Sequence, residues 1–253
     1  MQLSAKIRTA ISLVILCISI FAWVLLLVNP GHIMTVEHCR ISDSGPSAAS
    51  LQMLLEMNPI SSQLTGWGLM VVAMMLPKLI IPVQHIYGQS LKRLRFPSAL
   101  LFVLGYIAVW MAVGFVMVAI ILGLHLLMPG SYLPVTALGI IAVIWQFSPI
   151  KQRCLNRGHD HSVLAAFGWA AHRDALLFGI THGVWCAGSG WAIMLLPMLL
   201  PGGHNLAMVV VTFIMLSEHL EHPQTPRWRM DLSMKLFRII VAQTQIKLKQ
   251  YKA

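Results

Sequence analysis

Two side chains that can bind a soft metal, His182 and Cys186, lie four residues apart in an uncharged, mostly apolar stretch at residues 175–200. Spacing of four residues puts both side chains on one face of a helix. An imidazole and a thiol are costly in a hydrocarbon environment unless something binds them. A bound metal would explain the pair, and so would a polar contact with a neighbouring helix.

Long apolar stretches of this kind recur along the chain, which has 253 residues, 57% of them hydrophobic and 10% charged. Its mean hydropathy of +0.75 excludes an ordinary soluble domain. About 20 apolar residues cross the hydrocarbon layer of a bilayer as a helix, and the ten-residue alternation of an outer-membrane barrel is absent from the sequence. The sequence predicts an all-α, polytopic membrane bundle of about six transmembrane helices, at about residues 10–28, 64–86, 98–127, 132–149, 175–200 and 203–222.

The expected organisation is one transmembrane bundle at residues 1–222, with an outer loop at 29–62, followed by a basic tail at 223–253. All Lys and Arg residues except Arg40 and Lys78 fall on one side of the six expected helices. Because basic loops stay in the cytoplasm, we expect both termini there. Most of the net charge of +10 lies in the tail, beside the membrane surface. This position favours anionic lipid or a protein partner over nucleic acid.

The expected helix at 64–86 contains two prolines, Pro77 and Pro82. Proline removes a backbone donor, so we expect the helix to bend or open in its cytoplasmic half and to free carbonyl groups as acceptors. Lys78 lies at this point and is costly to bury alone. It needs a partner, for which Glu218 is a candidate, or a route for its amino group to the membrane surface.

A carboxylate can join the His182 and Cys186 pair. The connection Pro201-Gly202-Gly203 is so short that the helices on either side of it must be antiparallel neighbours. Glu218 on the second of these helices can therefore lie close to His182 and Cys186, as a ligand or as an acceptor that orients one. A thiol, an imidazole and a carboxylate are typical donors for a transition metal, and the soft donors favour copper or zinc.

The sequence contains 16 methionines, and some of them repeat at four-residue spacing on the expected helices. Thioethers suit Cu(I), although Met is also an ordinary apolar filler of membrane helices. We regard three of these residues as auxiliary soft donors, namely Met70, Met74 and Met194.

A second group of donors lies in the expected cytoplasmic loop, where Cys154, His159 and His161 occur within eight residues. They could capture a metal that arrives from inside the cell, or they could belong to a solvated loop. The outer loop has a weaker group of the same kind, at His32, Glu37, His38 and Cys39.

Haem binding is less well supported by the sequence. It would require a second histidine at the depth of His182 on a facing helix, and only His85 or His219 could serve. No nucleotide-binding, serine-hydrolase or zincin motif occurs.

Three segments carry a family resemblance: Trp67–Pro77, Trp145–Leu155 and His182–Trp191. They resemble the predicted metal-binding integral membrane proteins, a bacterial family of unknown function, over about residues 60–222, and Glu218 matches an acidic position of that family. The resemblance implies a metal-binding protein of the bacterial inner membrane. Family members usually carry cysteines where this chain has Gly158, Ser189 and Gly190.

The sequence supports three hypotheses about function. The first is a membrane protein that binds or handles a transition metal, most directly copper, through His182 and Cys186. The second is a non-catalytic subunit or scaffold of a membrane enzyme or transporter complex, or a homo-oligomer. The third is an enzyme that acts on a lipid or quinone, for which the sequence offers no assignable nucleophile and base.

Overall fold

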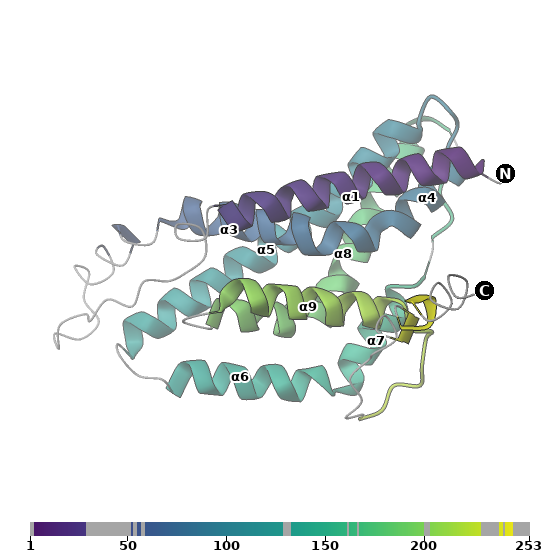
Figure 1. Cartoon of the computed structure of the whole chain (residues 1–253). Coiled ribbons are helices and arrows are strands. Elements are labelled where there is room, and N and C mark those ends of the chain that lie inside the picture. Colours follow the sequence, from purple (N-terminus) through teal and green to yellow (C-terminus); the bar gives the residue numbers. More distant parts are fainter. Residues whose placement is uncertain are drawn as a thin grey trace.

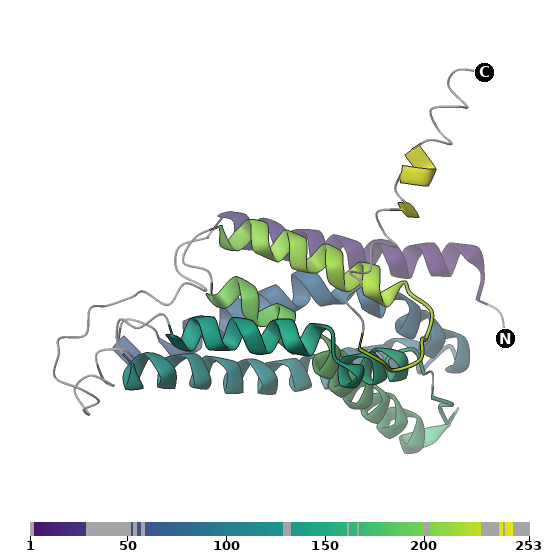
Figure 2. The ribbon, with the colours of Figure 1, turned by 90° about the horizontal axis from the view of Figure 1, so that it is seen from below.

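A computed structural model describes residues 3–28, 52, 55–56, 59–128, 133–160, 162–165, 167–199, 203–228, 238–239 and 241–244. The secondary structure over these residues is helical, as predicted, and contains no strand. The helical elements are α1 (Ala5–Val28), α3 (Ile60–Met75), η1 (Leu76–Leu79), α4 (Ile80–Gln89), α5 (Arg95–Leu127), α6 (Leu133–Gln146), α7 (Pro149–Arg157), α8 (Gly168–Leu199) and α9 (His204–His219). Helices α1, α6 and α9 run roughly along one direction, and α5 and α8 are inclined to them (Figures 1 and 2).

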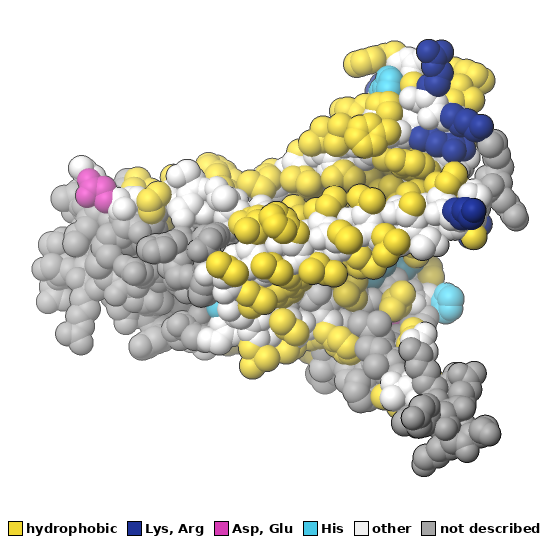
Figure 3. All heavy atoms as spheres, turned by 45° about the horizontal axis from the view of Figure 1, so that its top comes forward, with side chains coloured by type: hydrophobic (Ala, Val, Ile, Leu, Met, Phe, Trp, Pro, Cys, Tyr) yellow, Lys and Arg dark blue, Asp and Glu magenta, His cyan; other side chains and the backbone are white. Residues whose placement is uncertain are grey.

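Four helical segments among the described residues are long and apolar enough to cross a membrane, at Ala5–Val28, Ile60–Gln89, Arg95–Leu124 and Gly168–Met198. The other two expected spans are present as α6 and α9, with 14 and 16 residues. At 1.5 Å per residue these helices are roughly 21 and 24 Å long, shorter than a hydrocarbon layer of about 30 Å. Apolar side chains cover the middle of the face in Figure 3, and Lys and Arg gather at one end.

The prolines open the second expected helix, as predicted. The helix is divided into α3, the single 3₁₀ turn η1 and α4, and Pro77 lies in the turn. Proline at position 77 has no N–H to offer the carbonyl group of Ala73, one helical turn earlier. The hydroxyl group of Ser19 on α1 donates to this carbonyl at 2.6 Å. A hydrogen bond between two helices thus replaces the one that proline removes.

Helices α5 and α8 form the tightest contact in the bundle. A side chain at Gly179 would collide with the backbone of Phe102, and one at Gly105 would lie 2.8 Å from the carbonyl oxygen of Leu176. Gly183, one turn after Gly179, also packs against α5. Small residues let two helix backbones approach closely in a membrane, which is the packing role that the Gly179-x-x-x-Gly183 spacing indicates.

Two parts of the chain differ from the expected layout. Residues 149–157 form the helix α7 in a stretch expected as a loop, and the side chain of Ser148 caps it by accepting from the N–H of Lys151. Serine before proline is a common helix start, so the signal was present in the sequence. Helix α8 begins at Gly168, seven residues before the expected start at residue 175.

Helix α9 lies between two other helices and packs on both α8 and α3. Gly203, just before it, has a φ of 73°, a conformation that glycine adopts without strain. The start of α1 and the end of α9 lie at the same end of the bundle, where α7 also lies (Figure 1). Side chains from α3, α8 and α9 therefore meet in one interior.

Candidate metal centre

The structure keeps His182 and Cys186 together in the interior of the bundle. Both are on α8, and each side chain is 6% exposed. Tyr106 of α5 contacts both of them, because its hydroxyl group lies 3.1 Å from the Sγ of Cys186 and its ring centroid lies 5.9 Å from that of His182. Phe102 and Phe178 also pack on the imidazole ring. The pair is buried, and aromatic rings hold its imidazole.

Lys78 reaches the same point from the other side of the interior. It is 4% exposed, and its amino group donates to the Sγ of Cys186 at 3.5 Å. This contact joins residues 108 positions apart and involves neither Glu218 nor the membrane surface. The structure thus supplies Lys78 and Tyr106 to this site, a role that sequence reasoning missed.

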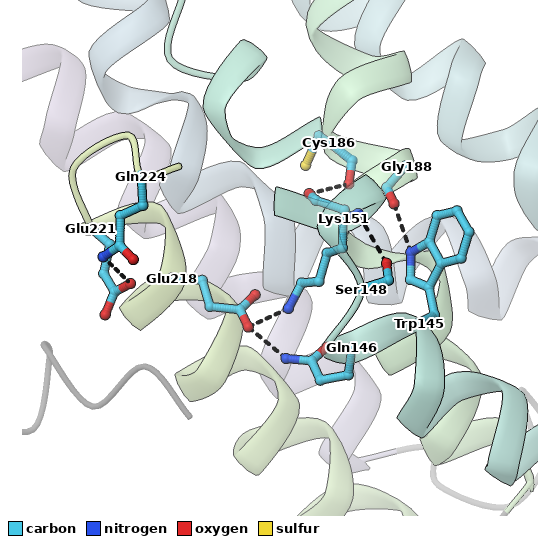
Figure 4. Close-up of polar contacts among 10 residues, drawn as sticks. Trp145, Gln146, Ser148, Lys151, Cys186, Gly188, Glu218, Glu221 and Gln224 are labelled. Carbon is cyan, nitrogen blue, oxygen red and sulfur yellow. Dashed lines mark hydrogen bonds and ion pairs between the residues drawn. The ribbon is translucent and has the colours of Figure 1, made fainter. Parts of the chain in front are cut away.

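Glu218 forms a polar cluster with Lys151 and Gln146, at the end of the bundle where α7 lies (Figure 1). Its Oε1 atom accepts hydrogen bonds from Lys151, with which it forms a buried ion pair, and from Gln146 at 2.6 Å (Figure 4). Burial lowers the pKa of Lys151, the Glu218 carboxylate raises it, and the charge of Lys78 lowers it further. Glu218 therefore links α6, α7 and α9, and its carboxylate is engaged by these two donors.

The second predicted donor group is divided between two helix contacts. The Sγ of Cys154 lies against Gly188 of α8, and burial raises the pKa of this thiol while Arg157 lowers it. The imidazole nitrogens of His159 lie 2.9 and 3.0 Å from the carbonyl oxygens of Leu155 and His219. The described structure therefore directs Cys154 toward α8 and His159 toward α9.

Several predicted donors lie outside the described residues, namely His161 and the group at His32, Glu37, His38 and Cys39. Within the described part of the chain, no three side chains from His, Cys, Asp and Glu come together as a group that could hold a metal ion. A site built on His182 and Cys186 in this part of the chain therefore needs other donors, such as thioethers.

The two histidines considered for haem binding make other contacts. His85 lies 3.1 Å from the carbonyl oxygen of Ser162, and its ring packs on Phe178. His219 stacks on His159.

Buried methionines are numerous in the interior of the bundle. Met70, Met74 and Met194, the predicted auxiliary donors, are each 0% exposed. Four others share their apolar core: Met75, Met198, Met208 and Met215. The four-residue spacing of Met194 and Met198 was visible in the sequence, and the other three were missed by sequence reasoning. The missed pair on α9, Met208 and Met215, are seven residues apart and share its buried face, a signal that the sequence contained. By contrast, the sequences of α1 and α6 contain no methionine.

Gly190 shows how closely one of these thioethers approaches α8. A side chain at position 190 would collide with the methyl group of Met215. Ser189, next to it, donates to the carbonyl oxygen of Cys186 at 2.9 Å. A thioether therefore lies beside α8 one helical turn from Cys186, where the family resemblance would place a thiol.

A comparison with protein families identifies the family of the chain. The family described as "PpoB2: Copper chaperone" matches residues 64–239, well over half of the chain. The chain belongs to the PpoB2 family. The matched segment includes His182, Cys186, Lys78 and all the buried methionines described above. No curated protein and no solved structure matches this PpoB2 chain.

Proposed function

We propose that this protein is an integral membrane copper chaperone that holds Cu(I) at His182 and Cys186. The observation that carries the proposal is a buried thiol and imidazole on one face of α8, in a chain whose family is described as copper chaperones. Cu(I) prefers thiolate, thioether and imidazole donors. Copper is here the cargo that the protein receives and passes on.

The surroundings of Cys186 fit this role. Lys78 of η1 and Tyr106 of α5 both contact its sulfur atom, so neighbouring helices fix the position of the thiol. Met70, Met74 and Met194, on α3 and α8, belong to the same apolar core as Cys186 and would supply further soft donors. A soft cation gains from such a site, whereas Mg²⁺ and Ca²⁺ favour oxygen donors.

The other predicted site residues receive different roles in the proposal. Glu218 positions α6, α7 and α9 through Lys151 and Gln146, without contacting copper. Cys154 is a capture ligand at the α7 end of the bundle, with His159 and His161 as secondary donors. The Sγ of Cys154 lies against Gly188, on the same helix as Cys186, which supports a transfer from α7 to α8.

We further propose that α6 and α9 join the four longer helices as membrane spans, in the bacterial inner membrane, with both termini in the cytoplasm. The distribution of Lys and Arg supports this orientation, and the basic tail would then contact anionic lipid or a protein partner. The common location of the start of α1 and the end of α9 agrees with it.

Metal analysis of the full-length protein in detergent tests the proposal. The wild-type protein, loaded anaerobically with Cu(I) and desalted, is expected to retain copper, and H182A and C186S are each expected to lose the copper bound at this site. C17S is the matched control, because Cys17 is an exposed thiol on α1. Protein that retains no copper, or that retains the same amount in H182A and C186S, would contradict the proposal and favour the scaffold hypothesis.

A further inference from the structure

A second candidate for metal binding lies at the opposite end of α8, where the chain passes into α9. His204, the first residue of α9, places its Nδ1 atom 2.7 Å from the carbonyl oxygen of Pro197. Because a carbonyl oxygen only accepts hydrogen bonds, this contact puts the proton on Nδ1 and the lone pair on Nε2. The Nε2 atom is buried and has no hydrogen-bond partner among the described residues.

The end of α8 explains why the imidazole is held in this way. The last four carbonyl groups of a helix have no N–H partner within it, and Pro197 is two residues from the described end of α8 at Leu199. His204 satisfies one of these carbonyls. Histidines that bind metals commonly donate their second ring N–H to a backbone carbonyl in this manner, which fixes the tautomer and the orientation of the ring.

Two buried thioethers occur within six residues of His204 in the sequence. Met208 is one helical turn after His204, on the same face of α9, and is 0% exposed. Met198 follows Pro197 directly and is 9% exposed. A water molecule would need two to four polar partners, which thioethers supply poorly, whereas a soft cation is satisfied by sulfur and an imidazole nitrogen.

We propose that the Nε2 atom of His204 and the thioethers of Met208 and Met198 form a second Cu(I) site. This inference rests on the proposed function, because it gives Cu(I), the cargo proposed above, a second binding site in the same protein. Met198 is 12 residues from Cys186 along α8, or about 18 Å at 1.5 Å per residue. Met194 lies between them on α8, and Met215 lies beside Gly190, so thioethers occupy the interval.

The test is a titration of the full-length protein in detergent with Cu(I), anaerobically, against a chromogenic Cu(I) chelator. We expect two Cu(I) ions per wild-type chain. H204A and M208L should each bind one ion, and C186S should bind one ion at the other site. M208L conserves the volume of the side chain and should fold normally, so it tests the site even if H204A misfolds. M117L is the matched control, because Met117 is on α5, outside both sites, and it should still bind two ions.

The outcomes separate this inference from the proposed function. If the wild-type protein binds one ion, lost in C186S and retained in H204A and M208L, only the second site is wrong. If H204A and M208L lose an ion and C186S loses none, the second site stands and the site at Cys186 is wrong. Wild-type protein that binds no Cu(I) would overturn both.

Discussion

The two ends of the α8–α9 pair differ in what surrounds the carboxylate at one end and the imidazole at the other. At the α7 end, Lys151 and Gln146 both donate to the Glu218 carboxylate. At the other end, the buried Nε2 atom of His204 has no hydrogen-bond partner among the described residues, and the nearby positions Met198 and Met208 carry buried thioethers. Groups that satisfy one another hold helices together, whereas unused lone pairs are available to a ligand. We therefore expect the Glu218 cluster to govern stability and the His204 end to supply a ligand for copper.

The largest expected effect is on the α7 end. E218Q leaves the ammonium group of Lys151 buried without its counter-ion, which typically costs about 3–5 kcal/mol of unfolding free energy. We expect this loss in denaturant titrations, with the Cu(I) stoichiometry of the folded protein unchanged. R173Q removes the exposed ion pair with Asp174 and should cost less than about 1 kcal/mol. A loss of copper without a loss of stability in E218Q would make Glu218 a ligand and remove the contrast between the ends.

A smaller effect on stability is expected where α1 meets the proline break. S19A leaves the carbonyl group of Ala73 without the donor that replaces the missing N–H of Pro77. A buried acceptor left unsatisfied costs about 1–3 kcal/mol. Thermal unfolding of the purified protein measures the loss, and T9A, whose hydroxyl group is exposed on α1 and donates to the carbonyl oxygen of Ala5 within that helix, is the matched control. Equal stability of S19A and T9A would show that the opened helix does not depend on α1.

Substitutions of methionines in the interior should have the opposite pattern, with little change in stability and a loss of affinity for Cu(I). M194L conserves volume, so the unfolding free energy should change by less than about 1.5 kcal/mol. The affinity for Cu(I), measured by competition with a chelator, should fall about tenfold, as for other groups that support a metal site. M111L, on α5, should leave the affinity unchanged. If M194L destabilises the protein and binds copper normally, Met194 is a packing residue and this region resembles the α7 end.

The smallest expected effect concerns the thiol of Cys154. Burial raises its pKa above the ordinary value, so its alkylation by iodoacetamide should reach half of the maximal rate at a higher pH than for a free thiol. Arg157 opposes this rise by stabilising the thiolate. R157Q should therefore raise the pKa further and slow alkylation at pH 8, while R153Q, in the same helix, serves as the control. Peptide mapping by mass spectrometry follows Cys154 alone. Faster alkylation in R157Q would contradict this account.

Much of the local structure follows from the sequence. Apolar stretches of sufficient length predicted the long helices, and the absence of an N–H on Pro77 predicted the opening of the second one. Four-residue spacing predicted that His182 and Cys186 share a face of α8. The helix α7 was missed, although Ser148 and Pro149 form a local start signal. These features depend on residues within about one helical turn of one another, which is why a single sequence contains them.

The sequence by itself determined the helical membrane-type composition, the proline break and the supply of soft donors. Only the tertiary structure decided which polar groups become partners: Lys78 contacts Cys186, and Glu218 pairs with Lys151. The tautomer of His204 likewise depends on the carbonyl group of Pro197 across a turn between helices. The physical reason is that these contacts depend on the depth and rotation of packed helices, which the helical periodicity of each segment leaves open.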